Sequence, residues 1–329
     1  MAYDNIKLEK GLYTTGKSFT QALEQLDPSE NYKGTSLEGL DAFERQLKRF
    51  DIKVAGKNSD TISKFFSTSD SAVLFPEFIS RAVKNGMTGN DRIENIVAST
   101  TLTDSLDYRS ISLSGEDDDY YLGEVGEGAA LPELTIGVKS NLTKLKKYGK
   151  MITASYEAIK FQRLDVFSLA LKKVGENIAK SQFIDALGSV LTDDTENIKT
   201  AGTKFTYDDL AKLWLSLYPY TMTTLIASPQ DVSELLTIQE FRDANAGLDF
   251  HGTGKLITPF GAEIICVEEL EAGIIYALDK NYAIEKVVAS DVTTEYDKII
   301  DRQLERAAVS TIVGFSPIFN DAVKVLSKA

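Results

Sequence analysis

The chain has little of what most catalytic and metal sites are built from. Its 329 residues include one histidine, His251, and one cysteine, Cys266. A Ser-His-Asp triad or a Cys-His dyad would have to use His251, which lies in an expected loop, Asp249–Gly254. Zinc sites need clustered His and Cys ligands, and none follow His251 nearby. We therefore expect no catalytic residue, no metal site and no cofactor.

Long apolar runs are also missing. No stretch of 18 or more apolar residues occurs, so we expect no membrane span. Residues 1–10 lack the apolar core of a signal peptide, and Cys266 has no partner for an internal disulfide. These features favour folding in a cytoplasm. The hydrophobic content of 43% allows a sizeable core, arranged as two lobes or as one elaborated fold.

Basic residues are outnumbered, 36 Lys and Arg against 49 Asp and Glu, which gives a formal net charge of −13. Broad nucleic-acid affinity needs the opposite excess, although acidity can also serve solubility alone. Gly252–Lys255 is not a phosphate loop, because Leu256 stands where a Ser or Thr is required. Gly123–Gly128 carries acids where a dinucleotide pyrophosphate would lie, so it is no dinucleotide motif either.

Residues 1–70 read as an arm. Turn residues dominate them, and one helix is predicted over Ser36–Phe50, capped by Ser36 or Thr35. Its apolar positions recur every three to four residues at Leu37, Leu40, Phe43 and Leu47. Little nearby sequence could cover this stripe, so we expect it to dock on the body or on a neighbour.

The next segment contains two predicted strands and an open stretch. Ile93–Val97 and Tyr108–Leu113 have strand composition. Residues 114–137 are then punctuated by glycines and Pro132, which breaks any regular pattern. A stretch this long and open inside a compact domain indicates a loop that reaches outward.

The strongest helical pattern runs from about Thr153 to Leu187, with Gly188 as its stop. Glu176 and Lys180 form an i,i+4 pair on its polar side. Its apolar stripe alternates steps of three and four residues at Leu164, Phe167, Leu171, Val174 and Ile178.

Helix and strand signals alternate from about residue 200 to 285. Thr206–Asp209 opens a helix, and Ser228–Pro229 opens another with a cap followed by proline. Strands are predicted over Thr223–Ala227, Ile264–Val267 and Ile274–Leu278, with Cys266 as a small buried hydrophobe. The tail, 301–326, reads as long β-structure with one face made of Val309, Thr311, Val313 and Phe315.

The order of these parts carries a resemblance. Gly123–Glu133 is similar to a "glu-gly-ala…pro-glu" loop tip, and Lys150–Glu157 followed by Asp165–Leu187 to a strand entering a long spine helix. Ala227–Leu236 is similar to an "asn-pro" helix start with Ser228 for Asn, and Thr258–Val267 to a late strand. Together they resemble the major capsid proteins of tailed bacteriophages, whose shell fold is named after phage Hong Kong ninety-seven.

The resemblance implies an α+β capsid fold in four parts. These would be an N-terminal arm (1–70), a peripheral domain with the spine helix (71–113, 149–200 and 286–329), an extended loop (114–148) and an axial domain (201–285). It implies a structural virion protein that forms pentamers and hexamers and closes an icosahedral shell around double-stranded DNA. Implied partners are a scaffolding protein, a portal and a maturation protease, with assembly in the bacterial host cytoplasm.

Two departures and two alternatives remain. No Asn occurs between Tyr282 and Phe319, which argues against the Lys–Asn crosslink of some relatives. Residues 1–70 are too short for a fused scaffold, which favours a separate one. An encapsulin-like compartment shell would share the fold and enclose protein cargo, and a soluble α/β enzyme is the alternative of another class.

Charge is segregated within the expected loop, and this gives the candidate contact residues between subunits. If the loop folds back as a hairpin, an acidic arm faces a basic one. The same basic arm could also contact acids of a neighbour. The candidate residues are Glu116, Asp117, Asp118, Asp119, Glu124, Glu127, Lys144, Lys146 and Lys147.

Overall fold

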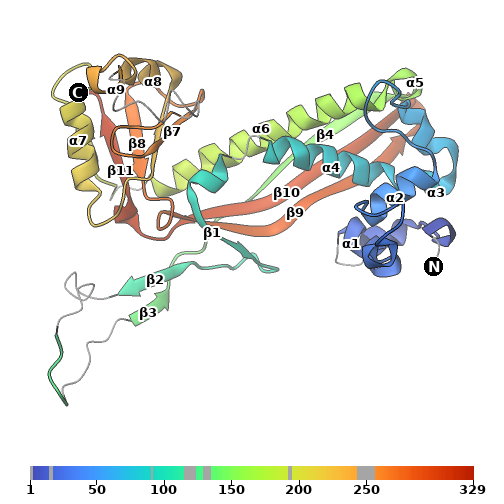
Figure 1. Cartoon of the computed structure of the whole chain (residues 1–329), viewed down its shortest axis with the longest axis horizontal. Helices are drawn as coiled ribbons and strands as arrows, with labels where there is room; N and C mark the ends of the chain where they lie inside the picture. Colours follow the sequence, from blue (N-terminus) through green and yellow to red (C-terminus); the bar gives the residue numbers. More distant parts are fainter. Residues whose placement is uncertain are drawn as a thin grey trace. The chain divides into compact units, whose positions relative to one another are not determined.

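The computed structural model describes residues 3–14, 18–89, 92–114, 124–128, 135–191, 195–242 and 256–329. Contacts divide the chain into two compact units, in both of which helices and strands are mixed (Figure 1). Unit 1 comprises Met1–Asp91, Lys147–Lys180 and Asp291–Thr311, and unit 2 comprises Arg92–Lys146, Ser181–Ser290 and Ile312–Ala329. The predicted four-part division stays a prediction. Within the described residues, no helix combines the length and apolar character needed to cross a membrane.

Unit 1 is mainly helical. Its helices are α1 (Phe19–Leu26), α2 (Ala42–Arg49), α3 (Ser69–Ala72), α4 (Phe75–Thr88), α5 (Tyr156–Phe161) and the part of α6 (Leu164–Val190) up to Lys180. Short 3-10 helices precede or connect them at Tyr3–Asn5, Lys10–Thr14, Ser29–Tyr32 and Ile62–Ser67. One core joins these elements, and in it the ring of Phe65 lies 5.5 Å from Phe75 and 5.4 Å from Phe78 between centroids. The apolar side chains of residues 1–70 thus share a core with α4.

Helix α2 begins later than predicted. Asp41, and not Ser36 or Thr35, is the N-cap: its carboxylate accepts the Glu44 amide at 2.8 Å, and Glu44 accepts the Asp41 amide in return at 3.0 Å. Gly39 has φ +83°, a left-handed backbone that no helix starting at Ser36 could include. Helix α1 was not predicted, although its cap, Ser18, forms the same kind of box with Gln21.

A buried arginine ties α2 to the end of α1. The Arg45 guanidinium is 0% exposed and donates to the Asp27 carboxylate at 2.8 Å and to the Leu40 carbonyl at 2.6 Å. Tyr32 donates its hydroxyl to the same Asp27 carboxylate at 2.6 Å. A buried charge persists only when it is paired and hydrogen-bonded in this way.

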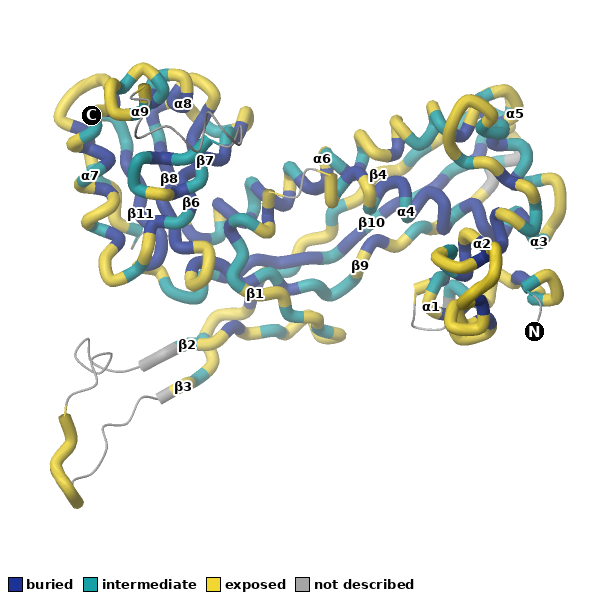
Figure 2. The backbone as a smooth tube through the Cα atoms, viewed as in Figure 1, coloured by how far each residue is buried: buried dark blue, intermediate teal, exposed yellow. Residues whose placement is uncertain are grey.

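Helices α4 and α6 touch through two glycines. A Cβ on Gly86 of α4 would lie 2.0 Å from the Lys172 carbonyl oxygen, and one on Gly175 of α6 would lie 2.0 Å from the Val83 carbonyl oxygen. Neither position has room for any side chain, so the two backbones are in direct contact. Figure 2 shows the buried residues along α4 that this contact helps to enclose.

The predicted apolar stripe of the long helix is confirmed, but its limits are not. Leu164, Leu171 and Ile178 are buried in the core of unit 1, with Phe167 and Val174 packed against it. The predicted start at Thr153 is wrong. Residues 153–155 end strand β4 (Leu145–Ser155), and α5 ends before α6 begins.

The break between α5 and α6 has a local cause. Gln162 is extended, its carbonyl accepts the Ile62 amide at 3.0 Å, and the Leu164 amide donates to the Asp60 carbonyl at 2.9 Å. These bonds hold residues 162–163 beside residues 60–62 in place of a continuous helix. At the other end Gly188 does not stop the helix, which continues to Val190.

A four-stranded sheet has the order β1-β9-β10-β4. Its strands are β1 (Val97–Leu102), β9 (Ile284–Ile299), β10 (Leu304–Pro317) and β4. The predicted face of the tail is confirmed in β10, where Val309, Thr311, Val313 and Phe315 are all buried. Strand β9 was not predicted. The strand predicted over Ile93–Val97 is wrong, because Ile93–Asn95 is a 3-10 turn and β1 starts at Val97.

Unit 2 contains a five-stranded sheet of order β5-β11-β8-β6-β7. Its strands are β5 (Asn197–Lys199), β6 (Thr224–Ala227), β7 (Glu263–Cys266), β8 (Ile274–Leu278) and β11 (Val323–Ser327). Helices α7 (Tyr207–Ser216), α8 (Pro229–Leu235) and α9 (Gln239–Arg242) accompany it, and the predicted caps Thr206 and Ser228 are confirmed. Cys266 was expected to be buried, but it is only half-buried. Strand β11 pairs with β5 and β8, although residues 286–329 were assigned to the peripheral part.

The glycine contact predicts opposite effects for two alanines in the same helix. Gly175→Ala should destabilise the subunit by about 3 kcal/mol, because the new methyl group meets backbone that cannot move aside. Gly188→Ala is the matched control: nothing lies within 4 Å of a Cβ there, so the change should stabilise by about 0.5–1 kcal/mol. Urea unfolding of the unassembled subunit measures both. Equal free energies of unfolding for the two variants would contradict the close contact.

Candidate functional site

The expected extended loop leaves unit 2 as a hairpin. Strands β2 (Ile111–Ser114) and β3 (Thr135–Val138) pair antiparallel, with Ile111 opposite Val138 (Figure 1). Two further backbone bonds extend the ribbon, from the Lys139 amide to the Ser110 carbonyl and from the Thr143 amide to the Tyr108 carbonyl, both 2.8 Å. We call residues 108–114 and 135–143 the loop stem. The strand predicted over Tyr108–Leu113 is thus confirmed in its second half.

One buried carboxylate holds the base of the loop stem. Glu285, near the start of β9, is 6% exposed and accepts hydroxyl hydrogens from Thr101 at 2.6 Å, Tyr108 at 2.5 Å, and Ser110. On the returning strand, Lys139 donates its ammonium to the Pro317 carbonyl at the end of β10. Both strands of the stem are therefore fastened to the four-stranded sheet.

The electrostatics of this group follow from its contacts. Burial by itself would raise the pKa of Glu285, but the hydroxyls of Ser110, Thr101 and Tyr108, with the charge of Lys139, together lower it. Burial lowers the pKa of Lys139, partly offset by Glu285. The carboxylate is thus ionised at neutral pH and serves as the common acceptor of three donors.

The loop stem and its surroundings expose large apolar side chains. Ile136 and Val138 are 69% and 68% exposed, although both lie in a strand. Contiguous exposed apolar surface is typical of sites that contact another molecule. The exposed apolar residues of this region are Leu102, Leu106, Ile111, Ile136, Val138 and Leu142.

The three predicted lysines lie at and just before the start of β4, an edge strand of its sheet. Lys144 and Lys147 are exposed, whereas Lys146 forms an ion pair of 2.8 Å with Asp185 of α6. The Lys144 carbonyl lies close to Gly314 of β10, where a Cβ would be 2.7 Å away. The structure therefore leaves Lys144 and Lys147 as the candidates for contact with another subunit.

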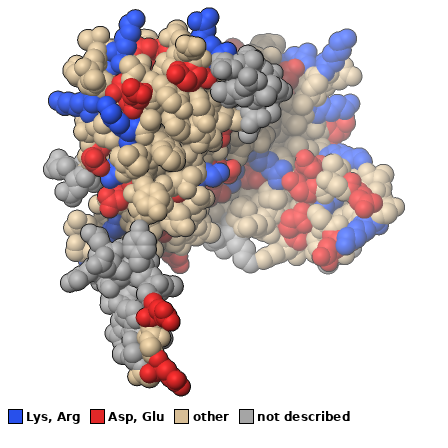
Figure 3. Space-filling view, turned by 60° about the vertical axis from the view of Figure 1, so that its left-hand side comes forward, with Lys and Arg blue, Asp and Glu red and all other residues tan. Residues whose placement is uncertain are grey.

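Of the predicted acids, Glu124 and Glu127 are described, and both are exposed; the acidic side chains of residues 124–128 are red in Figure 3. Glu116, Asp117, Asp118 and Asp119 lie outside the described residues, as does the segment that contains His251 and Gly252–Lys255. In the described part of the chain, no group of His, Cys, Asp and Glu is arranged to hold a metal ion.

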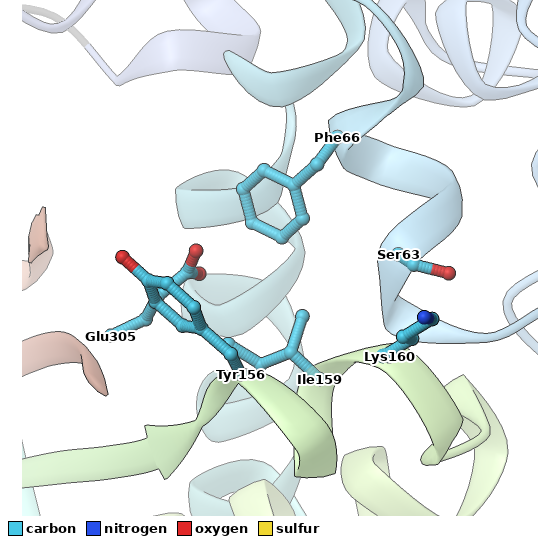
Figure 4. A pocket seen from close by; sticks show the side chains of 6 residues that line it. All are labelled: Ser63, Phe66, Tyr156, Ile159, Lys160 and Glu305. Atoms are coloured by element: carbon cyan, nitrogen blue, oxygen red, sulfur yellow. The ribbon is translucent and has the colours of Figure 1, made fainter. Parts of the chain in front are cut away.

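A shallow pocket of about 270 Å³ lies in unit 1. Burial raises the pKa of its Glu305 carboxyl, which accepts the Tyr296 hydroxyl. Figure 4 shows Ser63 and Lys160 on one side of the pocket and Glu305 with Tyr156 on the other. Its lining residues are Ser63, Phe66, Tyr156, Ile159, Lys160 and Glu305.

Comparison with known protein families identifies the family of the chain, and the matched region includes part of the loop stem and the long strands. The sequence profile of a family described as phage capsid protein matches residues 139–315, more than half of the chain. The chain belongs to the phage capsid protein family. As a member it is a structural component of the virion capsid, which confirms the interpretation drawn from the order of its parts.

Solved structures agree with this at the level of the fold. The virus-like particle from Pyrococcus furiosus is 15% identical with a TM-score of 0.55, and the match covers 77% of this chain and 99% of that one. The capsid of a native GTA particle is 14% identical at 0.52, covering 72% and 90%. Gordonia phage Cozz is also 14% identical at 0.52, covering 72% and 86%. The expected α+β capsid fold is therefore confirmed.

The curated proteins include none with significant sequence similarity to this capsid protein. At identities near 15%, the structural matches carry the fold and no residue roles. The role of Glu285 could not be predicted from the sequence. A single glutamate near apolar residues has the same sequence pattern whether it is buried or on the surface.

The lowered pKa of Glu285 predicts how its contribution depends on pH. A carboxyl with a lowered folded-state pKa stabilises the fold above its unfolded-state value, and that contribution is lost as pH falls through the folded-state value. Wild type should exceed Glu285→Gln in stability by about 1.5–3 kcal/mol near pH 7. The difference should hold down to about pH 5.5 and shrink below the ordinary value of 4.5. Thermal unfolding of unassembled subunits measures it.

Glu295→Gln is the control for that experiment, because Glu295 is an exposed residue of the same strand. Its stability relative to wild type should change little between about pH 7 and pH 5.5. A Glu285→Gln difference that grew on acidification would mean that the carboxyl is held neutral, contrary to the hydrogen bonds described.

Proposed function

We propose that copies of this chain form pentamers and hexamers that close into an icosahedral shell around double-stranded phage DNA. The family match over residues 139–315 is the observation that carries the proposal. The net charge of −13 fits a container that packs DNA without binding its sequence. In this role the chain has no catalytic function, and it works in the virion after assembly in the bacterial host cytoplasm.

The loop stem supplies the contact between neighbouring subunits in this proposal. Fully burying one large aliphatic side chain stabilises by about 1.5–3 kcal/mol, and Ile136 and Val138 are exposed in the subunit. A neighbour that covered this strand would therefore gain several such contributions from one short segment. In a closed shell every subunit both offers its stem and covers another.

Charge adds a second contribution. Exposed Lys144 and Lys147 follow the stem, and exposed Glu124 and Glu127 lie farther out along the same loop. We propose that these lysines contact acidic groups of the neighbouring subunit. One exposed pair contributes only about 0–1 kcal/mol, but a shell repeats the contact in every subunit.

Other proteins complete the proposed assembly. A separate scaffolding protein, a portal and a maturation protease are the partners that a shell of this family calls for. Residues 1–70 contain short helices that share the core of unit 1.

The first test is whether the chain assembles. Purified protein, alone and with a co-expressed scaffold, should yield capsomers or closed particles in electron micrographs, with faster species in sedimentation velocity. Particles without nucleic acid but with a host protein inside would instead favour a compartment shell. A compact monomer at every concentration under both conditions would contradict the shell proposal.

The second test reverses the exposed lysines. Lys144→Glu with Lys147→Glu should lower particle yield at low salt, because repulsion replaces attraction at each contact. Lys146 is left unchanged because its ion pair with Asp185 belongs to the subunit itself. Salt should lower the wild-type yield and narrow the difference, since exposed charges are screened within about 10 Å at 0.1 M.

Lys204→Glu with Lys212→Glu is the matched control, with the same charge change at exposed residues of unit 2 away from the loop. Thermal unfolding of the subunit should be similar for both double variants. Equal particle yields from the two would show that the loop is held by its apolar side chains alone.

A further inference from the structure

We propose that Glu285 is a positioning residue that sets the direction in which the extended loop leaves the subunit. The inference deepens the proposed shell function, because a loop that must reach a neighbour has to leave its own subunit at a defined angle. It concerns the root of the loop stem, which we define as residues 108–110 and 139–143.

The geometry of the outgoing strand supports this role. Glu285 lies opposite Ser99 in the register of β1 and β9, so Thr101, two residues along, is on the same face of the sheet. Tyr108 and Ser110 are likewise two residues apart on the outgoing strand, and both hydroxyls donate to Glu285. A single carboxylate thus joins the edge strand β1, strand β9 and two alternate residues of the outgoing strand.

The returning strand has its own attachment. The Lys139 ammonium donates to the Pro317 carbonyl at the end of β10, next to β9 in the sheet. Across the root, the Arg109 guanidinium donates to the Ser140 carbonyl, and the Thr143 amide to the Tyr108 carbonyl at 2.8 Å. A ribbon attached at one point can rotate, whereas attachment of its two strands to two adjacent strands removes that freedom.

Packing beyond the root does not supply the same restraint. Ile136 and Val138 of β3 are more than two-thirds exposed, at 69% and 68%, and Ile111 of β2 is 45% exposed. The stem is therefore not pressed against the rest of unit 2 at these positions. The polar contacts at the root remain as the restraint on its direction.

The hydroxyl donors can be removed without changing shape. Thr101→Val with Tyr108→Phe deletes two of the three donors to Glu285 and keeps the volume of both side chains. Thr101→Ser is the conservative control that keeps the donor. Glu285→Gln perturbs the same contacts from the acceptor side, because it removes the charge and replaces one acceptor oxygen by an amide donor, so the test does not depend on one variant folding.

The measurement is the distance distribution between spin labels in the full-length chain. Labels at Glu127→Cys on the loop and Lys212→Cys on α7, in a Cys266→Ser background, occupy exposed positions of unit 2. Labelled subunits are studied unassembled. The double variant and Glu285→Gln should broaden the distribution at least twofold, and Thr101→Ser should leave it as narrow as in the parent.

Assembly gives the second readout. Without labels, the double variant and Glu285→Gln should yield several-fold fewer closed particles than the wild type. Thr101→Ser should yield as many particles as the wild type. Broad distances in a chain that never assembles would uphold the positioning role and overturn the shell function. Unchanged distance widths in both Glu285→Gln and the Thr101→Val, Tyr108→Phe double variant, even with lower thermal stability, would overturn the positioning role and leave the shell function standing.

Discussion

Direct backbone contact between α4 and α6 is the constraint on which the core of unit 1 depends. Gly86 and Gly175 each face a carbonyl oxygen of the other helix, so no residue with a side chain can take either place. The aromatic rings around Phe75 pack in the same core as the two helices. The contact thereby fixes the position of α6 against α4 within unit 1.

The elements that were predicted well from the sequence have one buried face or a local cap. The stripe from Leu164 to Ile178 and the caps at Thr206 and Ser228 are of this kind, and the structure confirms them. The mixed α+β capsid fold followed from the order of such elements, and the family match bears it out. Patterns of this type are short-range, so they survive without knowledge of the rest of the chain.

Other features depend on partners distant in sequence. Strand β9 has no clean alternation, since acids, threonines and Tyr296 interrupt it, and its neighbours β1 and β10 define it. The break at Gln162 depends on bonds to residues 60–62, and the glycine contact depends on α4 meeting α6. In the candidate site, charge segregation in the sequence indicated Lys144, Lys146 and Lys147. Only the structure shows that Lys146 forms an ion pair with Asp185 of its own subunit.

Strand β4 stands at the edge of its sheet, and Lys146, Lys147 and Lys150 lie along it. An open edge offers unpaired backbone groups to any other strand, and charged lysines are a common way to discourage such pairing. Subunits that gather at high local concentration meet edge to edge often, in every wrong orientation as well as the right one. In the proposed shell, the lysines along this edge would disfavour strand pairing between crowded subunits and leave the other surfaces as the favoured contacts.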